Sequence, residues 1–196
     1  MIKILTFVLA SIIVSSCVTN PGREPKPVPA SYLYKGSYIN IKVPNSDGWH
    51  LLNSNSSGME FAKSGAEKKE SFGAQVLIFP LRETKNEDEF LSVIKAGIEA
   101  DTGPSRFDTK QLDLSYTEKR GYSCVKVSGE LEDKKSLTSP GYREPLILQI
   151  ESLYCRHPVR TDTGFAIIYS QRGPSKYPKL DAEAEQFISG VQVPNF

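Results

Sequence analysis

Hydrophobic and polar residues alternate along much of the chain, and this period of two predicts β-strands. In SYINIKV, residues 37–43, the apolar side chains of Ile39, Ile41 and Val43 fall on one side, and Pro44 ends the run before the turn NSDG. Turn-forming residues separate the other runs in the same way. Further strands are predicted at residues 49–53, 58–64, 72–81, 110–118, 121–131, 145–156 and 164–171.

Two segments have the period of an amphipathic helix instead. The first follows Asn86, whose side chain can cap a helix together with Glu89, and it ends at Gly103 and Pro104. Its buried stripe is predicted to be Phe90, Leu91, Ile94 and Ile98. The second helix is predicted in LDAEAEQFISG, residues 180–190, with an apolar stripe of Leu180, Ala184, Phe187 and Ile188.

Strands that follow one another through short turns, with the helices set apart from them, favour an antiparallel sheet with helices packed on it. The predicted fold class is therefore α+β, with an antiparallel β-sheet flanked by helices as an α/β/α sandwich. Residues 32–196 have the size of one domain and an ordinary apolar content, so we predict a single globular domain there.

The N-terminal segment has the features of a secretory signal peptide. Lys3 precedes an apolar run that is too short to span a bilayer comfortably, and small residues follow it. Residues 14–17, VSSC, resemble the bacterial lipobox, in which the cysteine is acylated, with palmitate among the acyl chains, and becomes the first residue of the mature chain. An ordinary signal peptide with an incidental cysteine is the alternative. We predict a lipoprotein signal peptide at residues 1–16 and lipidation of Cys17.

The residues after Cys17 indicate where the anchored protein lies. In lipoproteins of this kind an aspartate directly after the cysteine retains the protein in the inner membrane, and this position is Val18 here. The predicted location is therefore the outer membrane, with the domain facing the periplasm. Residues 17–31 contain four prolines and no apolar periodicity, so we predict a semi-rigid linker that holds the domain off the membrane.

The charge distribution argues against nucleic acid as a partner. The formal net charge is +1, and the charged stretches AEKKE and EDKK mix both signs within a few residues. Stretches of mixed charge are typical of solvated loops. Nucleic-acid binding needs a clustered basic surface, which these stretches do not provide.

A family resemblance rests on the order of elements between Gly36 and Val193. The segments GSYINIKVP, DGW, DEFLSVIKAGI, GFAIIYSQRG and AEAEQFISGVQV resemble those of the photosystem II PsbP family and its bacterial relatives. The resemblance implies the PsbP-like fold, which the yeast Ran-binding nuclear-import factor shares. It also implies docking onto larger assemblies, without catalytic groups, and it carries no site residues to this chain.

A search for catalytic motifs finds only weak candidates. Ser92 and Lys95 satisfy S-x-x-K, in which a lysine one turn away can activate a serine, and Ser123 and Lys126 match it on a strand. Ser92 is predicted to point into solvent, opposite the apolar stripe of its helix. No G-x-S-x-G, H-E-x-x-H or P-loop motif occurs. We expect no enzymatic activity and no cofactor.

Cys124, Cys155 and His157 form the remaining candidate site. Cys155 and His157 are two residues apart on a strand, so with Cys124 they offer two sulfurs and a nitrogen to zinc or copper. The other interpretation is a structural disulfide, which the oxidising periplasm favours. With Cys17 assigned to lipid, two cysteines remain and can pair.

The apolar pattern of one hairpin predicts its register. The strand around Val125 carries its apolar residues at odd positions, and the strand around Ile150 carries them at even positions. Opposed residues lie on one face, so paired numbers must sum to an odd value. The register that pairs Cys124 with Cys155 meets this condition and centres the turn in the polar loop at residues 139–140. We predict a Cys124–Cys155 disulfide there, on the less apolar face, and no metal site.

The predicted function is a non-catalytic binding or assembly module of an outer-membrane-anchored periplasmic lipoprotein, with a protein partner in the envelope. The alternative is a periplasmic metal-binding protein that uses Cys124, Cys155 and His157.

Overall fold

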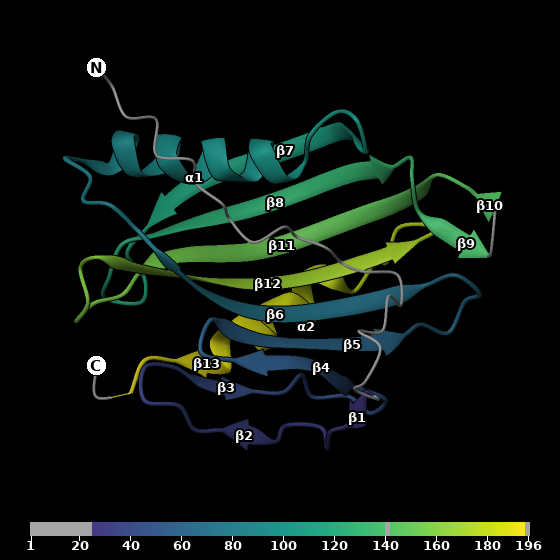
Figure 1. The fold of residues 1–196 in the computed structure, drawn as a ribbon, viewed down its shortest axis with the longest axis horizontal. Coiled ribbons are helices and arrows are strands. Elements are labelled where there is room, and N and C mark those ends of the chain that lie inside the picture. Colours follow the sequence, from purple (N-terminus) through teal and green to yellow (C-terminus); the bar gives the residue numbers. More distant parts are fainter. Residues whose placement is uncertain (1–24, 140–141, 195–196) are drawn as a thin grey trace.

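An eight-stranded antiparallel sheet forms the centre of the computed structural model, which describes residues 25–139 and 142–194 (Figure 1). The strand order is β1-β4-β5-β6-β12-β11-β8-β7, so β1 and β7 form opposite edges. These strands are β1 (Lys26–Pro27), β4 (His50–Asn55), β5 (Gly58–Ser64), β6 (Ser71–Pro80), β7 (Phe107–Thr117), β8 (Cys124–Asp133), β11 (Leu146–Arg156) and β12 (Thr163–Gly173).

Shorter strands form two further sheets. A three-stranded sheet has the order β13-β3-β2, with β2 (Leu33–Tyr34), β3 (Asn40–Lys42) and β13 (Val191–Gln192). The predicted polar loop between β8 and β11 contains a small hairpin of β9 (Leu137–Ser139) and β10 (Tyr142–Arg143).

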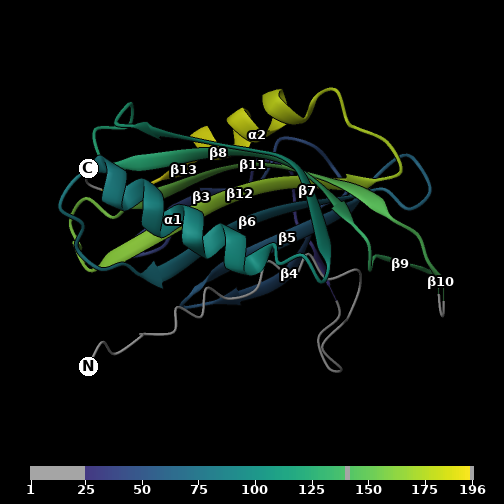
Figure 2. The ribbon, with the colours of Figure 1, turned by 90° about the horizontal axis from the view of Figure 1, so that it is seen from above.

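The two helices begin and end close to their predicted bounds. Helix α1 (Glu87–Asp101) has Asn86 as its N-cap, and the Asn86 side chain accepts a hydrogen bond from the backbone N–H of Glu89 at 2.9 Å. Helix α2 (Leu180–Ser189) ends at Gly190. The helices lie on opposite faces of the large sheet, α1 against β7 and β8 and α2 against β11 and β12 (Figure 2).

The large sheet has an apolar core on each face, because apolar side chains of its strands project to both sides of the sheet. On the α1 side, Phe90 and Ile94 of the helix pack on Val127 and Ile168 of the sheet. On the other side, α2 and the three-stranded sheet cover a core that includes Trp49 and Phe61. The tyrosines of this second core anchor α2, since Tyr169 and Tyr177 each donate a hydrogen bond to Glu183 at 2.6 and 2.7 Å.

The predicted α/β/α sandwich is wrong, because the structure is mostly antiparallel β-sheet and the helices cover only part of each face. Helix α1 reaches the β7–β8 side of one face. On the other face, the three-stranded sheet covers much of the core beside α2. The pattern of apolar residues shows which faces of a strand are buried, but it does not distinguish a covering helix from a covering strand.

The register of the β8–β11 hairpin is confirmed. Cys155 lies opposite Cys124 and Leu148 lies opposite Leu131, as the odd-sum rule requires. Cys124 and Cys155 are joined by a disulfide, with Cα atoms 4.0 Å apart, the close spacing of a non-hydrogen-bonded pair. The bridge does not lie on a less apolar face, however. Both cysteines are fully buried in the core beneath α2, next to Phe165.

Strand pairing begins earlier than the predicted start of the domain at Tyr32. Lys26 and Pro27 pair with Leu51 and His50 at the edge of the large sheet. The backbone N–H of Val28 then donates to the Trp49 carbonyl at 3.0 Å. The last residues of the proline-rich segment therefore pack on the sheet, where a proline at an edge costs no ladder hydrogen bond.

Candidate functional site

The structure separates the residues that the sequence singled out. Cys17 and the signal peptide lie outside the described residues. Ser92 is exposed on α1, as predicted, and its Oγ donates a hydrogen bond to the Asp88 carbonyl at 2.8 Å. Lys95 forms an ion pair with Glu99 at 3.6 Å on the same exposed face. The S-x-x-K pair therefore lies on a solvated helix face and not in a pocket.

The cysteine and histidine side chains of the metal hypothesis have structural roles. The two sulfurs are bonded to each other, so they are not available as thiolate ligands. His157 is buried, and its Nδ1 accepts hydrogen bonds from the backbone N–H groups of Val159 and Arg160, both at 3.2 Å. The imidazole thus closes the turn between β11 and β12. Among the described residues, no group of three or more His, Cys, Asp or Glu side chains is placed to hold a metal ion.

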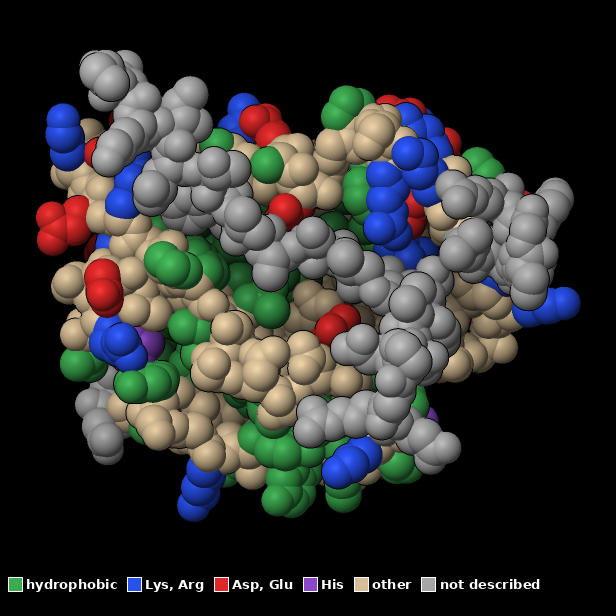
Figure 3. Space-filling view, viewed as in Figure 1, with side chains coloured by type: hydrophobic (Ala, Val, Ile, Leu, Met, Phe, Trp, Pro, Cys, Tyr) green, Lys and Arg blue, Asp and Glu red, His purple; other side chains and the backbone are tan. Residues whose placement is uncertain are grey.

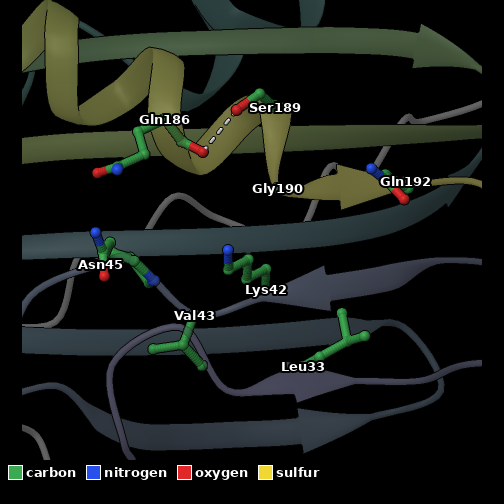
Figure 4. Close-up of a pocket in the computed structure, with 9 residues that line it drawn as sticks. Leu33, Lys42, Val43, Asn45, Gln186, Ser189, Gly190 and Gln192 are labelled. Carbon is green, nitrogen blue, oxygen red and sulfur yellow. Dashed lines mark hydrogen bonds between the residues drawn. The ribbon is translucent and has the colours of Figure 1, made fainter.

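A recess of about 350 Å³ lies where α2 ends and the chain turns into β13 (Figure 4). The apolar part of its lining is Leu33 of β2 together with Val43 and Pro44, which follow β3. The polar lining comes from β3, from the same following segment, from the last turn of α2 and from β13, and it consists of Lys42, Asn45, Gln186, Ser189 and Gln192.

Close backbone contacts build this corner of the molecule. Gly190 accepts a hydrogen bond from the backbone N–H of Lys42 at 3.2 Å. A Cβ atom at Gly190 would lie only 3.1 Å from the Cβ of Lys42, so a side chain there would push β3 away from the helix end. Arg120, between β7 and β8, donates to the carbonyl oxygens of Ile188 at 3.0 Å and of Val191. These contacts fasten the end of α2 and the start of β13 to the large sheet.

The Lys42 ammonium group points into the space between β3 and the end of α2 (Figure 4). Within the described part of the chain, it has no hydrogen-bond or ion-pair partner. The position is favourable for a cation, because a helix C-terminus carries partial negative charge. Lys42 therefore needs no counter-ion from the protein, and its three donors remain available to a ligand.

The chemistry of the lining favours an oxygen-rich or anionic ligand. The side chains of Gln186 and Gln192 have no hydrogen-bond partner in the described residues, so both amides can donate and accept. Asn45 uses its Oδ1 to accept from Ser31 at 2.8 Å, which leaves its N–H groups as donors. The lining contains no Asp, Glu, His or Cys, so it offers one positive charge, several N–H donors and no carboxylate to repel an anion.

A smaller depression of about 140 Å³ lies on the opposite face, over β5, β6 and β12. Its walls are mainly apolar, from Leu77, Phe79 and Ile168, and Glu60 contributes a carboxylate. Burial raises the pKa of Glu60, against the opposing effect of a 2.9 Å hydrogen bond from Gln75. This depression holds less than half the volume of the recess, so it is the weaker candidate.

One partly buried carboxylate, at the C-terminal end of α1, lines neither cavity. Asp101 is the last residue of α1, where a negative charge is unfavourable, and its Oδ2 atom is buried without a hydrogen-bond partner in the described residues. Burial raises the pKa of Asp101 to about 6. The folded protein therefore binds a proton on Asp101 more tightly than the unfolded chain does.

This shift predicts that Asp101→Asn stabilises the protein in a pH-dependent way. Ionised Asp101 opposes folding fully above about pH 6, and the penalty disappears as the pH falls toward 3.8. The stability difference between Asp101→Asn and wild type should therefore grow by about 1–2 kcal/mol between pH 4.5 and pH 8, allowing for partial solvent screening. Urea denaturation across that range measures it. A difference that stays constant across that range would contradict the assignment.

The local sequence does not mark the polar residues of the recess as a site. The alternation in SYINIKV does place Lys42 on the polar side of its strand. Neither the pairing of β13 with β3 nor the position of the α2 end beside Lys42 has a local sequence signal. Only the absence of acidic residues near Lys42 could have drawn attention to this segment.

Comparisons with known proteins identify no family for this chain. No family model matches it, and no curated protein matches it either. Among solved structures, it is similar to one described as "Crystal structure of LpqN involved in cell envelope biogenesis of Mycobacterium tuberculosis". The two chains are 12% identical, the TM-score is 0.48, and the match covers 87% of this chain and 90% of that chain. The PsbP resemblance is not shown by these comparisons.

The helices of the described residues are also relevant to how the protein meets a membrane. Neither α1 nor α2 is long and apolar enough to cross a bilayer.

Proposed function

We propose that this protein is a lipoprotein, anchored through Cys17 in the outer membrane, whose domain is a non-catalytic binding module facing the periplasm. The recess carries this proposal. Within the described part of the chain, its lining combines a lysine ammonium group without a partner, two amide side chains without hydrogen-bond partners, and no carboxylate. Such a lining can hold a polar or anionic group, but it contains no nucleophile paired with a base. Ser189, its one hydroxyl, donates to the Gln186 carbonyl at 2.9 Å.

The signal-peptide and lipobox patterns support the envelope location. These patterns predict a domain outside the cytoplasm, and a disulfide such as Cys124–Cys155 is in keeping with that environment. A ligand of the recess must then be a component of the envelope, either a protein partner or a molecule of the membrane or wall.

Site-specific photo-crosslinking tests whether the recess is the binding site. A benzophenone amino acid at position 192, in place of Gln192, should capture a discrete adduct when cells are irradiated with the envelope intact. The same group in place of Glu99, on the exposed face of α1, should not form that adduct. When Lys42→Glu is added to the protein that carries benzophenone at position 192, the adduct should disappear, because the lysine of the recess is replaced with a charge that repels an anion. Lys95→Glu in the same protein should leave the adduct unchanged.

Two outcomes would contradict the proposed site. One is the absence of any adduct specific to position 192. The other is an adduct that forms equally well in the Lys42→Glu background, since the recess would then have no part in holding the captured molecule.

A further inference from the structure

We propose that the recess and the neighbouring edge of the small sheet together bind the anionic phospholipid headgroups of the membrane in which the protein is anchored. This inference rests on the proposed function, because it assumes the anchor at Cys17. We call the residues concerned the β2 surface. They are Tyr32, Leu33, Lys35, Tyr38 and Lys42.

The β2 surface has the composition of a membrane-contacting region. Tyr32, Leu33 and Tyr38 are 50%, 44% and 48% exposed, and they are three of the four large hydrophobic side chains that the described residues leave exposed. Single exposed apolar residues are ordinary, but three within seven positions need an explanation. Figure 3 shows hydrophobic side chains gathered at the lower edge of the molecule, where β2 lies, with Lys and Arg side chains beside them. Tyrosines at the level of lipid headgroups are typical of membrane interfaces.

The charge of the same segment complements an anionic bilayer. Residues 25–46 contain three lysines and no Asp or Glu, although the whole chain has 23 acidic residues. Lys26, Lys35 and Lys42 are all exposed. Leu33 lies directly opposite Lys42 in the pairing of β2 with β3, so an apolar and a cationic side chain project side by side. Lysines near an anionic lipid surface are attracted to it.

The position of the anchor brings this surface to the bilayer. Pro25 follows Cys17 by eight positions in the sequence, and a chain of eight Cα–Cα steps spans at most about 28 Å whatever its path. β1 starts at Lys26 and β2 follows it after five residues, and both lie on the same edge of the molecule, away from α1 (Figure 1). The opposite edge, β7, is seven strand spacings from β1, about 34 Å.

The recess opens on the β2 surface, because Leu33 and Lys42 belong to both. A headgroup phosphate is an oxygen-rich anion of the kind that its lining favours. Lys42 would donate to the phosphate as a point charge, and the amides of Gln186 and Gln192 would donate to the remaining oxygens. Three lysines give only weak binding at physiological salt, so the contact depends on the anchor, which keeps the surface at a high local concentration of lipid.

Spin labelling of the full-length lipidated protein in vesicles tests the inference. The two described cysteines are buried in a disulfide, so a thiol introduced by Leu33→Cys can be labelled selectively with a nitroxide. In vesicles that contain phosphatidylglycerol, the label at position 33 should collide several-fold less often with a water-soluble nickel complex than in pure phosphatidylcholine vesicles. Tyr38→Cys should show the same change and keeps Leu33 intact. Glu99→Cys on α1 should show none.

The variants and controls separate the possible failures. Lys35→Glu combined with Lys42→Glu should restore the accessibility of the label at position 38. If labels at positions 33 and 38 stay as accessible as the label at position 99 while the protein remains bound to vesicles, the inference is wrong and the anchor stands. If the wild-type protein does not bind vesicles at all, the proposed anchor itself fails. Equal protection in both lipids would exclude headgroup charge and overturn the inference.

Discussion

Replacing Cys17 by alanine should move the protein from the membrane fraction to the soluble periplasm. In lipoproteins the thiol of this cysteine carries the lipid, so its removal deletes the proposed anchor. The β2 surface alone binds too weakly to retain the protein at physiological salt. Fractionation of cells with detection of the protein measures the change, which should be nearly complete.

Metabolic labelling with palmitate gives this experiment a second readout. The wild-type protein and a control variant, Thr19→Ala, should both incorporate palmitate and sediment with membranes. Cys17→Ala should do neither. Palmitate incorporation by Cys17→Ala, or its absence from the wild type, would refute the anchor regardless of how the variant fractionates.

Asp133→Ala should cost about 3–5 kcal/mol of folding stability, the effect of breaking a buried ion pair from one side. Asp133 is fully buried at the end of β8. Arg106 donates to both of its carboxylate oxygens, at 2.9 and 3.2 Å, and Arg172 of β12 lies 3.2 Å from Oδ2. The substitution removes the carboxylate that these two guanidinium groups share. Urea denaturation of the variant and the wild type measures the loss.

The pH dependence of the same variant provides an independent check. Burial raises the pKa of Asp133, but the hydrogen bond from Arg106 and the charges of both arginines outweigh it, and the net pKa is lowered. Its stabilising contribution is thus fully present above about pH 3.8 and is lost as the pH falls through the folded-state pKa. The exposed control Asp108→Ala, which loses an ion pair with Lys110, should change stability little. A similarly small change for Asp133→Ala would contradict the role assigned to this cluster.

Local patterns were sufficient to predict the main elements and one long-range pairing. Apart from β1, the strands of the large sheet follow from periodicity, and both helices and the Asn86 cap follow from periodicity and capping residues. The β8–β11 register followed from parity together with the position of the polar loop. A one-residue slip would move Val127 or Leu148 to the wrong face.

The layer arrangement could not be predicted in the same way. β1, β2 and β13 have two residues each, too few to show a period, and β1 contains a proline. They are strands because β3 and β4 offer free edges, which is a property of the assembled sheet. This is why the helix-covered sandwich was the wrong expectation, and why the first residues of the domain were assigned to a linker.

The candidate site is harder to predict from the sequence than the fold is. Lys42, Gln186 and Gln192 are ordinary surface residues in the sequence, and they become a recess only because α2 ends beside β3. The residues with distinctive chemistry, Cys155 and His157, serve instead to hold the core and a turn together. The reactive residue types in the sequence therefore marked positions with a structural role. The recess, in contrast, forms where segments distant in the sequence come close together.

The mass of the species captured from position 192 tests the binding module most directly. Irradiation of cells that carry the benzophenone at position 192, followed by mass spectrometry of the purified protein, should give an added mass equal to an anionic phospholipid. The adduct should be absent in the Lys42→Glu background. A protein adduct that depends on Lys42 would keep the recess as a binding site and exclude the headgroup as its ligand. No adduct, or one that is indifferent to Lys42, would contradict the assignment of the recess as the functional site.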